Sequence, residues 1–210
     1  MKGSRVLIKT IFTAAVLVFA SAAAFANTIL VAPVNGNLYQ QTVQSPCIFT
    51  NSSCQQGSFV GTPLDNGGSV TGYDATVSYT GSQILSIIGA GNALLLGLDI
   101  NQASGQPAQT LTSFTMSING VLADSTPGAT SVPAGNNGNG YADYLLSNFS
   151  SFGANDTILF HFVFSNANDG TENVFLIGGP ASSVPEPISV ALTGSGLLGL
   201  LFLRKRFANR

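Results

Sequence analysis

The stretch Thr157-Ile-Leu-Phe-His-Phe-Val-Phe164 decides the fold of this 210-residue chain. Its residues alternate with a period of two, which is typical of a β-strand whose successive side chains point to opposite faces of a sheet. One set is strongly apolar and is expected to face the core: Ile158, Phe160, Phe162 and Phe164. The other set holds Leu159, His161 and Val163. The sequence therefore predicts a core strand here.

The segments around this strand are rich in Gly, Asn, Ser and Thr, with β-branched and aromatic residues between them. Such composition favours strands joined by polar turns. Further strands are predicted at residues 28–32, 38–43, 70–79, 83–88, 93–100, 109–118 and 172–177. The last of these is expected to run antiparallel to 157–164. In 109–118, Thr112, Phe114, Met116 and Ile118 are expected to face inward.

Three segments carry weaker or different signals. Residues 93–100 could form a strand or a buried helix, and their length favours a strand. Residues 141–152 could likewise form either element, while 125–140 has no periodicity and is predicted to be a long loop. Asn119-Gly120 lies between two apolar runs and indicates a two-residue hairpin turn. The expected fold class is all-β: an antiparallel, jelly-roll-like β-sandwich at residues 27–178.

Charge is distributed unevenly along the chain. The seven basic residues lie only near the two ends: Lys2, Arg5, Lys9, Arg204, Lys205, Arg206 and Arg210. Residues 27–183 therefore hold no Lys or Arg but eight of the nine acids, all except Glu186, which gives this body a formal charge of −8. A body without cations cannot neutralise phosphates, so nucleic acid is excluded as a partner.

Two cysteines, Cys47 and Cys54, lie close together in the chain. In an oxidising compartment such a pair predicts a disulfide that closes a polar loop, stabilising the fold by about 2–3 kcal/mol. The alternative is a metal site, which would need two more soft ligands. The one histidine is far away in the sequence.

The N-terminus carries the pattern of a signal peptide at residues 1–26. Lys2, Arg5 and Lys9 precede an apolar stretch, and Ala24-Phe25-Ala26 matches the small-residue cleavage pattern. Cleavage after Ala26 is expected. The alternative is a retained transmembrane helix.

The C-terminus carries a second targeting pattern. A linker at 179–187 ends in Val184-Pro185-Glu186-Pro187, and residues 188–203 hold no charged side chain. As a helix these residues would span about 24 Å, close to the thickness of a membrane core. Arg204, Lys205 and Arg206 would stay in the cytoplasm with the tail at 204–210. A single C-terminal transmembrane helix is predicted.

This order of motif, apolar helix and basic cluster resembles the PEP-CTERM sorting signal of Gram-negative bacteria. The resemblance covers Val184 to Arg206 only, and the tail after Arg206 departs from signals that end at the basic cluster. It implies an exosortase as partner, beside the secretion machinery and the membrane. It also implies export across the inner membrane, transient anchoring there, and delivery to the cell surface or the extracellular polysaccharide matrix of a biofilm.

Residues suited to chemistry are sparse. His161 is the single imidazole, and its place inside a strand favours a structural role. Paired carboxylates could hydrolyse glycosides, but most acids lie at predicted strand ends or turns. We expect no catalytic residue and no enzyme. Asn166, Asn168, Asp169 and Glu172 form the densest oxygen-ligand cluster, and with Asp156 they could bind Ca²⁺ in place of forming an ordinary hairpin loop.

The sequence thus predicts a destination rather than a reaction. The expected function is that of an exported surface or matrix protein with a non-catalytic structural body. Two alternatives stay open. The body could be a lectin-like module that binds neutral polysaccharide through exposed Tyr and Asn side chains, or the protein could be a surface protein whose membrane anchor is never cut.

Overall fold

The structure is a computed structural model that describes residues 26–50, 54, 56–64, 72–133, 138–167, 170 and 172–180. These residues are mostly β, in two mixed sheets with one short helix. The predicted signal peptide, sorting motif and C-terminal helix lie outside the described residues, apart from Ala26. Within the described ranges no helix is both long and apolar enough to cross a membrane.

Sheet A contains six strands in the order β1-β8-β7-β11-β5, with β9 paired to the far end of β7. Its strands are β1 (Asn27–Thr28), β5 (Gly72–Thr80), β7 (Gln109–Ile118), β8 (Val121–Ser125), β9 (Thr130–Val132) and β11 (Thr157–Ser165). Sheet B contains six strands in the order β2-β10-β6-β12-β3-β4. Its strands are β2 (Leu30–Pro33), β3 (Cys47–Thr50), β4 (Thr62–Pro63), β6 (Ala93–Asp99), β10 (Tyr144–Ser147) and β12 (Asn173–Gly179).

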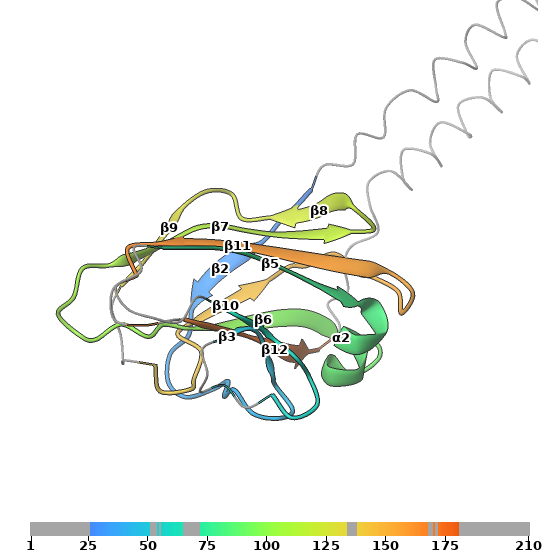
Figure 1. Ribbon diagram of the computed structural model, residues 1–210, viewed down its shortest axis with the longest axis horizontal. Coiled ribbons are helices and arrows are strands. Elements are labelled where there is room, and N and C mark those ends of the chain that lie inside the picture. The colour runs from blue at the N-terminus through green and yellow to red at the C-terminus, as the bar shows by residue number, and fades with distance from the viewer. Residues whose placement is uncertain are drawn as a thin grey trace, which may run out of the picture.

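The two sheets lie as two layers with the main core between them (Figure 1). Both sheets contribute phenylalanines to this core. Phe162 of β11 stacks on Phe49 of β3 with ring centroids 5.5 Å apart, and Phe164 lies 5.4 Å from Phe162. Buried apolar area of this kind is the main favourable term in folding. The core thus joins β11 to a strand more than a hundred residues earlier in the chain.

The alternation predicted for β11 is confirmed. Ile158, Phe160, Phe162 and Phe164 are all buried, while Leu159 is exposed on the other face. The alternation predicted for β7 is only half right, because Leu111 is fully buried and Thr112 is exposed. The register against β11 passes from Ser113 to Leu111 and skips Thr112. A bulge at Thr112 therefore reverses which side chains face inward over the first part of the strand.

The prediction of purely antiparallel sheets was wrong at their margins. β1 runs parallel to β8, and β3 runs parallel to β4. Both pairs span only two residues in one partner, so their direction leaves no periodic trace in the sequence. The pairings between the longer strands are antiparallel.

The strand predicted at 83–88 is the helix α2 (Gly81–Ile88). Thr80 starts it with a capping box: its hydroxyl accepts from the Gln83 amide, and the Gln83 side chain accepts from the Thr80 amide. Ile84 and Ile88 are four residues apart and both are buried, which is the spacing of one helix face. The cap and this spacing outweigh the β-branched composition.

The last strand was predicted to pair with β11, and this was wrong. β12 crosses to sheet B, where it lies between β6 and β3. Both faces of a strand in this position are covered, and residues 173–177 are all buried. A strand buried on both faces reads as a continuous apolar run, so nothing in its sequence marks its partner.

Shorter elements also differ from expectation. Residues 38–43 form only isolated bridges at Gln40 and Thr42, and β9 lies inside the predicted loop 125–140. Residues 93–99 form a strand, which confirms the favoured prediction. In 141–152, which could have been a helix or a strand, residues 144–147 form the strand β10. The predicted hairpin is confirmed: Asn119 and Gly120 have φ of 53° and 80°, and Ile118 pairs with Val121.

Candidate functional site

The outer face of sheet B is covered by a second, smaller core. It is formed by Cys47, Ala142, Phe175 and Ile177, with Val34, Tyr39, Cys54, Leu95 and Leu145 packed against it. Gly97 of β6 lies opposite Phe175, and a Cβ at Gly97 would come within 2.4 Å of the phenyl ring. Only glycine leaves room for this aromatic ring to lie flat against the sheet.

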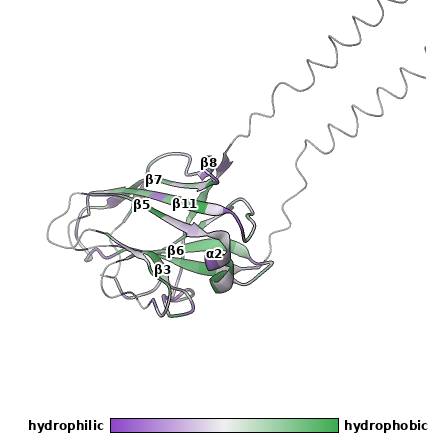
Figure 2. Ribbon diagram, turned by 45° about the vertical axis from the view of Figure 1, so that its right-hand side comes forward, coloured by the Kyte–Doolittle hydropathy of each residue, from purple (hydrophilic) through white to green (hydrophobic). Residues whose placement is uncertain are grey.

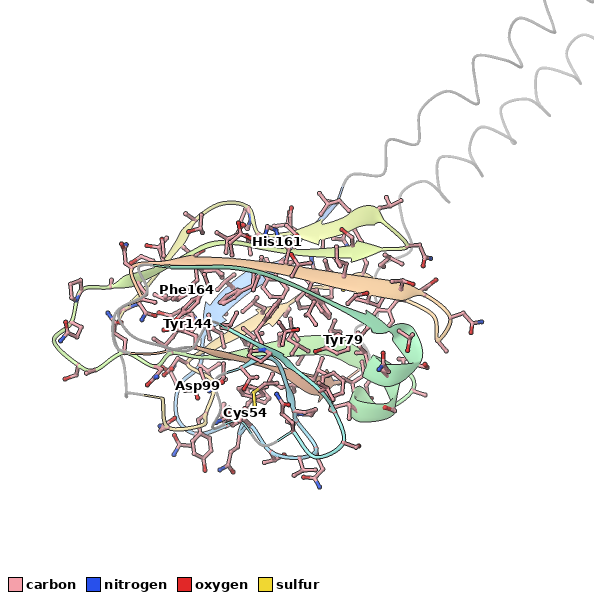
Figure 3. The ribbon with its side chains drawn as sticks, viewed as in Figure 1. Cys54, Tyr79, Asp99, Tyr144, His161 and Phe164 are labelled. Carbon is pink, nitrogen blue, oxygen red and sulfur yellow. A yellow bond between two sulfur atoms is a disulfide. The ribbon has the colours of Figure 1, made fainter. Side chains whose placement is uncertain are left out.

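The predicted disulfide between Cys47 and Cys54 is present, with Cα atoms 6.3 Å apart. The loop that it closes was predicted to be polar. This was wrong for its first half, because Cys47–Thr50 is the buried strand β3. The crosslink therefore ties one strand of sheet B to the segment that follows it. Figure 3 shows Cys54 and Asp99 on the outer side of the sheet B layer.

The outer face of sheet A is polar and uncovered by described residues. Cross-strand rows of polar side chains lie on it, such as Thr76, His161 and Thr115. Figure 2 shows mixed hydropathy along β5 and β7, whereas β3 and β6 are apolar along their length. His161 lies on this outer face (Figure 3).

His161 and Asp74 of β5 form a hydrogen-bonded pair. Its Nε2 atom lies 2.6 Å from Asp74 Oδ1, and the two side chains are 36% and 75% exposed. An Asp–His pair could orient an imidazole for proton transfer. Here it lies on an open sheet face, which supplies no water-excluding cleft. Strand alternation places His161 on the outer face. The pair with Asp74 could not be predicted from the sequence, because only the register between β5 and β11 brings the two residues together.

Asp99, which is buried, and Asp143, which is half-buried, form an acidic pair at one end of sheet B. Asp99 Oδ2 accepts a hydrogen bond from the Gly140 amide at 3.1 Å, and Asp143 Oδ2 accepts from the Ile100 amide at 2.8 Å. Burial and, to a smaller extent, the nearby Asp143 charge raise the pKa of Asp99 to about 6, although hydrogen bonds from Gly140 and Asn173 act to lower it. Both carboxylates hold loop backbone in place.

Among the described acids, Glu172 has the pKa that is raised most. It is fully buried just before β12, and burial raises its pKa from 4.5 to about 8. The Gln109 amide lies close enough to lower this pKa in part. No regular hydrogen bond reaches either carboxyl oxygen from the described residues. The sequence analysis placed Glu172 in the candidate Ca²⁺ cluster and at the start of the predicted strand 172–177, and it did not predict that the side chain is buried.

The predicted Ca²⁺ ligands are not seen together. Asn166 is exposed in a left-handed turn with φ of 63°, Glu172 is buried, and Asn168 and Asp169 lie outside the described residues. Asp156 accepts from the Gly153 amide and from Asn119 Nδ2. Among the described residues no three His, Cys, Asp or Glu side chains are placed to hold a metal. The Ca²⁺ loop stays a prediction.

The remaining predicted site residues also lie outside the described ranges. These are Val184, Pro185, Glu186, Pro187, Arg204, Lys205, Arg206 and Ala24. Comparison with known proteins gives no match to a family model, to a curated protein or to a solved structure. Any function proposed for this chain is therefore inferred from its own sequence and structure.

Proposed function

We propose that this is an exported protein, sorted by an exosortase to the cell surface or extracellular polysaccharide matrix, with a non-catalytic structural body. The observation that carries the proposal is where the folded body lies in the chain. β1 begins at Asn27, directly after the predicted cleavage site at Ala26. β12 ends at Gly179, and only residues 180–183 separate it from Val184 of the sorting motif.

The disulfide supports the same destination. Cys47–Cys54 is the kind of crosslink that persists outside the cytoplasm, because cytoplasmic thiols are kept reduced. The body has no Lys or Arg, so its stability rests on burial, backbone pairing and neutral hydrogen bonds. We further propose that its two layers form a jelly-roll-like β-sandwich, a fold class that serves as a rigid extracellular module.

A structural body is better supported than the lectin-like alternative. Binding of neutral sugars was expected to use exposed Tyr and Asn side chains, and the tyrosines do not fit this expectation. Tyr73 and Tyr79 are buried in the core, and Tyr39, Tyr141 and Tyr144 are half-buried. A pull-down with the producer's own polysaccharide tests the alternative. Retention that is lost on free-sugar competition would favour a binding module.

The sorting proposal is tested by the intact mass and both termini of the protein isolated from its native host. A chain that starts at Asn27 and ends near Val184–Pro187 is expected. A chain that still ends at Arg210 would favour the second alternative, a surface protein with a permanent anchor.

The matched variant replaces Pro185 and Glu186 with alanine and leaves the apolar segment and basic cluster intact. Full-length protein should then accumulate in the inner membrane. A variant that retains Pro185 and Glu186 but replaces Phe207 with alanine serves as the control and should be processed normally. Normal release of the Pro185/Glu186 variant would rule out recognition of this motif.

A further inference from the structure

A buried carboxylate lies where the first strand of the body meets β8. Asp124 is 0% exposed, and its register partner on β7, Met116, is buried as well. Side chains of directly paired residues lie on the same face of a sheet, so the Asp124 carboxyl group points to the core side of sheet A, away from His161 on the outer face. Residues 27–183 contain no Lys or Arg to neutralise this charge.

Ser150 supplies hydrogen bonds to the Asp124 carboxylate. The Ser150 amide donates to both carboxyl oxygens at 3.1 Å, and the hydroxyl donates to Oδ1 at 2.6 Å. Burial raises the pKa of Asp124 although these hydrogen bonds act to lower it, so the cost of burying the charge is not fully offset. A carboxylate offers about four acceptor positions, which leaves room for a further donor.

The strand β1 is held beside this carboxylate by contacts of both its residues. Asn27 is the register partner of Asp124 in the parallel pair of β1 and β8. Its Nδ2 atom lies 3.2 Å from Ser150 Oγ, the same hydroxyl that contacts the carboxylate. The carbonyl oxygen of Thr28 accepts from Asn148 Nδ2 at 2.8 Å. The backbone nitrogen of Asn27 is therefore held next to Asp124.

Cleavage after Ala26 would change the chemistry of that nitrogen. Hydrolysis of the Ala26–Asn27 bond leaves a carboxylate on the signal peptide and an amine on the body, whose pKa of about 8 keeps it mostly protonated at neutral pH. This nitrogen lies about 1.5 Å from the Asn27 Cα, and neighbouring strands lie about 4.8 Å apart. An ammonium group at Asn27 is thus within reach of the carboxyl group of its register partner.

We propose that Asp124 is the binding site for the α-ammonium group that removal of residues 1–26 creates at Asn27. The ammonium brings a positive charge and three N–H donors to a buried carboxylate, where the precursor has one neutral amide N–H. The ion pair fastens β1 to β8 in the mature chain alone, so the body gains stability when its signal peptide is removed. This inference rests on the cleavage after Ala26 that the proposed function includes.

The distribution of lysines makes this pair accessible to a selective test. Lysines occur only at Lys2, Lys9 and Lys205, and the first two are lost with the signal peptide. In Lys205→Arg protein isolated from its native host, the amine of Asn27 is therefore the one primary amine. Its intact mass and N-terminal sequence are determined first. A start other than Asn27 would overturn both this inference and the cleavage step of the proposed function.

An amine-selective acetylating reagent then removes the charge of this single amine. The thermal midpoint of the Lys205→Arg protein should fall by about 2–4 °C on acetylation. With Asp124→Asn added, acetylation should leave the midpoint unchanged, because asparagine carries no charge and still accepts from the Ser150 amide. The matched control is Asp74→Asn, which removes a 75% exposed acid of β5 and should keep the full response.

Two results of the melting experiment would overturn the inference alone, provided that the chain starts at Asn27. One is an unchanged midpoint after acetylation of the Lys205→Arg protein. The other is an equal fall with and without Asp124→Asn, which would show that the acetyl group disturbs β1 by its bulk and not by loss of the charge.

The second measurement needs no substitution at Asp124. The rate of acetylation at Asn27 is compared between the native protein and the same protein in urea, with a short peptide that begins Asn-Thr-Ile as the reference in both solutions. An ion pair keeps the amine protonated and therefore unreactive, so the native rate should be several-fold lower. Asn27 is exposed, which leaves it accessible to the reagent. Equal rates relative to the peptide would overturn the inference.

Discussion

The outer faces of the two sheets differ sharply: outward side chains of sheet A are exposed or half-buried, whereas those of β3 and β12 in sheet B are mostly buried. On sheet A the outer positions hold mostly polar side chains, including the exposed His161–Asp74 pair, with Leu159 and Val163 of β11 among them. On sheet B the outer positions hold Phe175 and Ile177, which are buried under the segment that contains the disulfide. The same structural position, an outward side chain on a central strand, is therefore a surface site in one layer and a core site in the other.

This difference shows which interactions stabilise the body. Without cations the body cannot use side-chain salt bridges beyond the His161–Asp74 pair, and its stability depends on apolar burial. A second core on the outer face of sheet B adds burial that the space between the layers alone would not provide. The four predictions below test this comparison.

Phe175→Ala should have the largest effect. Removal of a fully buried ring from the second core is expected to cost about 3–5 kcal/mol in the free energy of unfolding. Leu159→Ala, at an outward position of sheet A that is 37% exposed, is the matched control and should cost about 1 kcal/mol or less. Chemical denaturation measures both. Similar losses would mean that the two outer faces do not differ as described.

Replacement of both Cys47 and Cys54 by serine should have the next largest effect. Loss of the crosslink frees a short loop in the unfolded chain and should cost about 2–3 kcal/mol. Cys47 is itself fully buried, so the serine variant adds a desolvation cost at that position. Comparison with the chemically reduced wild type separates the two contributions. No change in denaturation midpoint on reduction would show that β3 holds its place without the crosslink.

Asp99→Asn should flatten the acid side of the stability profile. The pKa of Asp99 is raised from 3.8 to about 6, so its contribution is present below pH 3.8 and is lost as the pH rises to about 6. The variant should remove the part of the wild-type decline that lies in this window. Asn retains an acceptor for the Gly140 amide. An unchanged profile between these pH values would contradict the assigned burial of Asp99.

His161→Gln should have the smallest effect. The pair with Asp74 is exposed, and exposed ion pairs contribute about 0–1 kcal/mol. The free energy of unfolding, measured by chemical denaturation at neutral pH, is expected to fall by no more than this amount. A loss as large as that of Phe175→Ala would show that the outer face of sheet A is covered in the intact protein.

The sequence was informative wherever periodicity was long. Alternation in 157–164 and 109–118 predicted β11 and most of β7, and Asn119-Gly120 predicted the hairpin between β7 and β8. The disulfide followed from spacing and compartment. These features depend on neighbours within a few residues, which is the range over which side-chain pattern and turn chemistry act.

Most features that were wrongly predicted depend on distant partners, and α2 is the exception because its capping signal is local. The prediction placed β12 beside β11, in the wrong sheet, because a strand buried on both faces carries no alternation that would mark its partner. α2 was mistaken for a strand because its isoleucines resemble strand residues, although Thr80 and Gln83 carry a capping signal. The burial of Glu172 beside Gln109 could not be predicted, because it arises where two sheets meet from segments about sixty residues apart.

The place of β12 has a consequence for the order in which the chain can assemble. β3 lies between β12 and the two-residue strand β4, so its main neighbour is the last strand of the body to leave the ribosome. β2 likewise can pair only after β10 has been synthesised, more than a hundred residues later in the chain. Once the chain is in an oxidising compartment, the local Cys47–Cys54 loop can close early. It cannot complete sheet B until residues 173–179 are available, so the body folds late and as a unit.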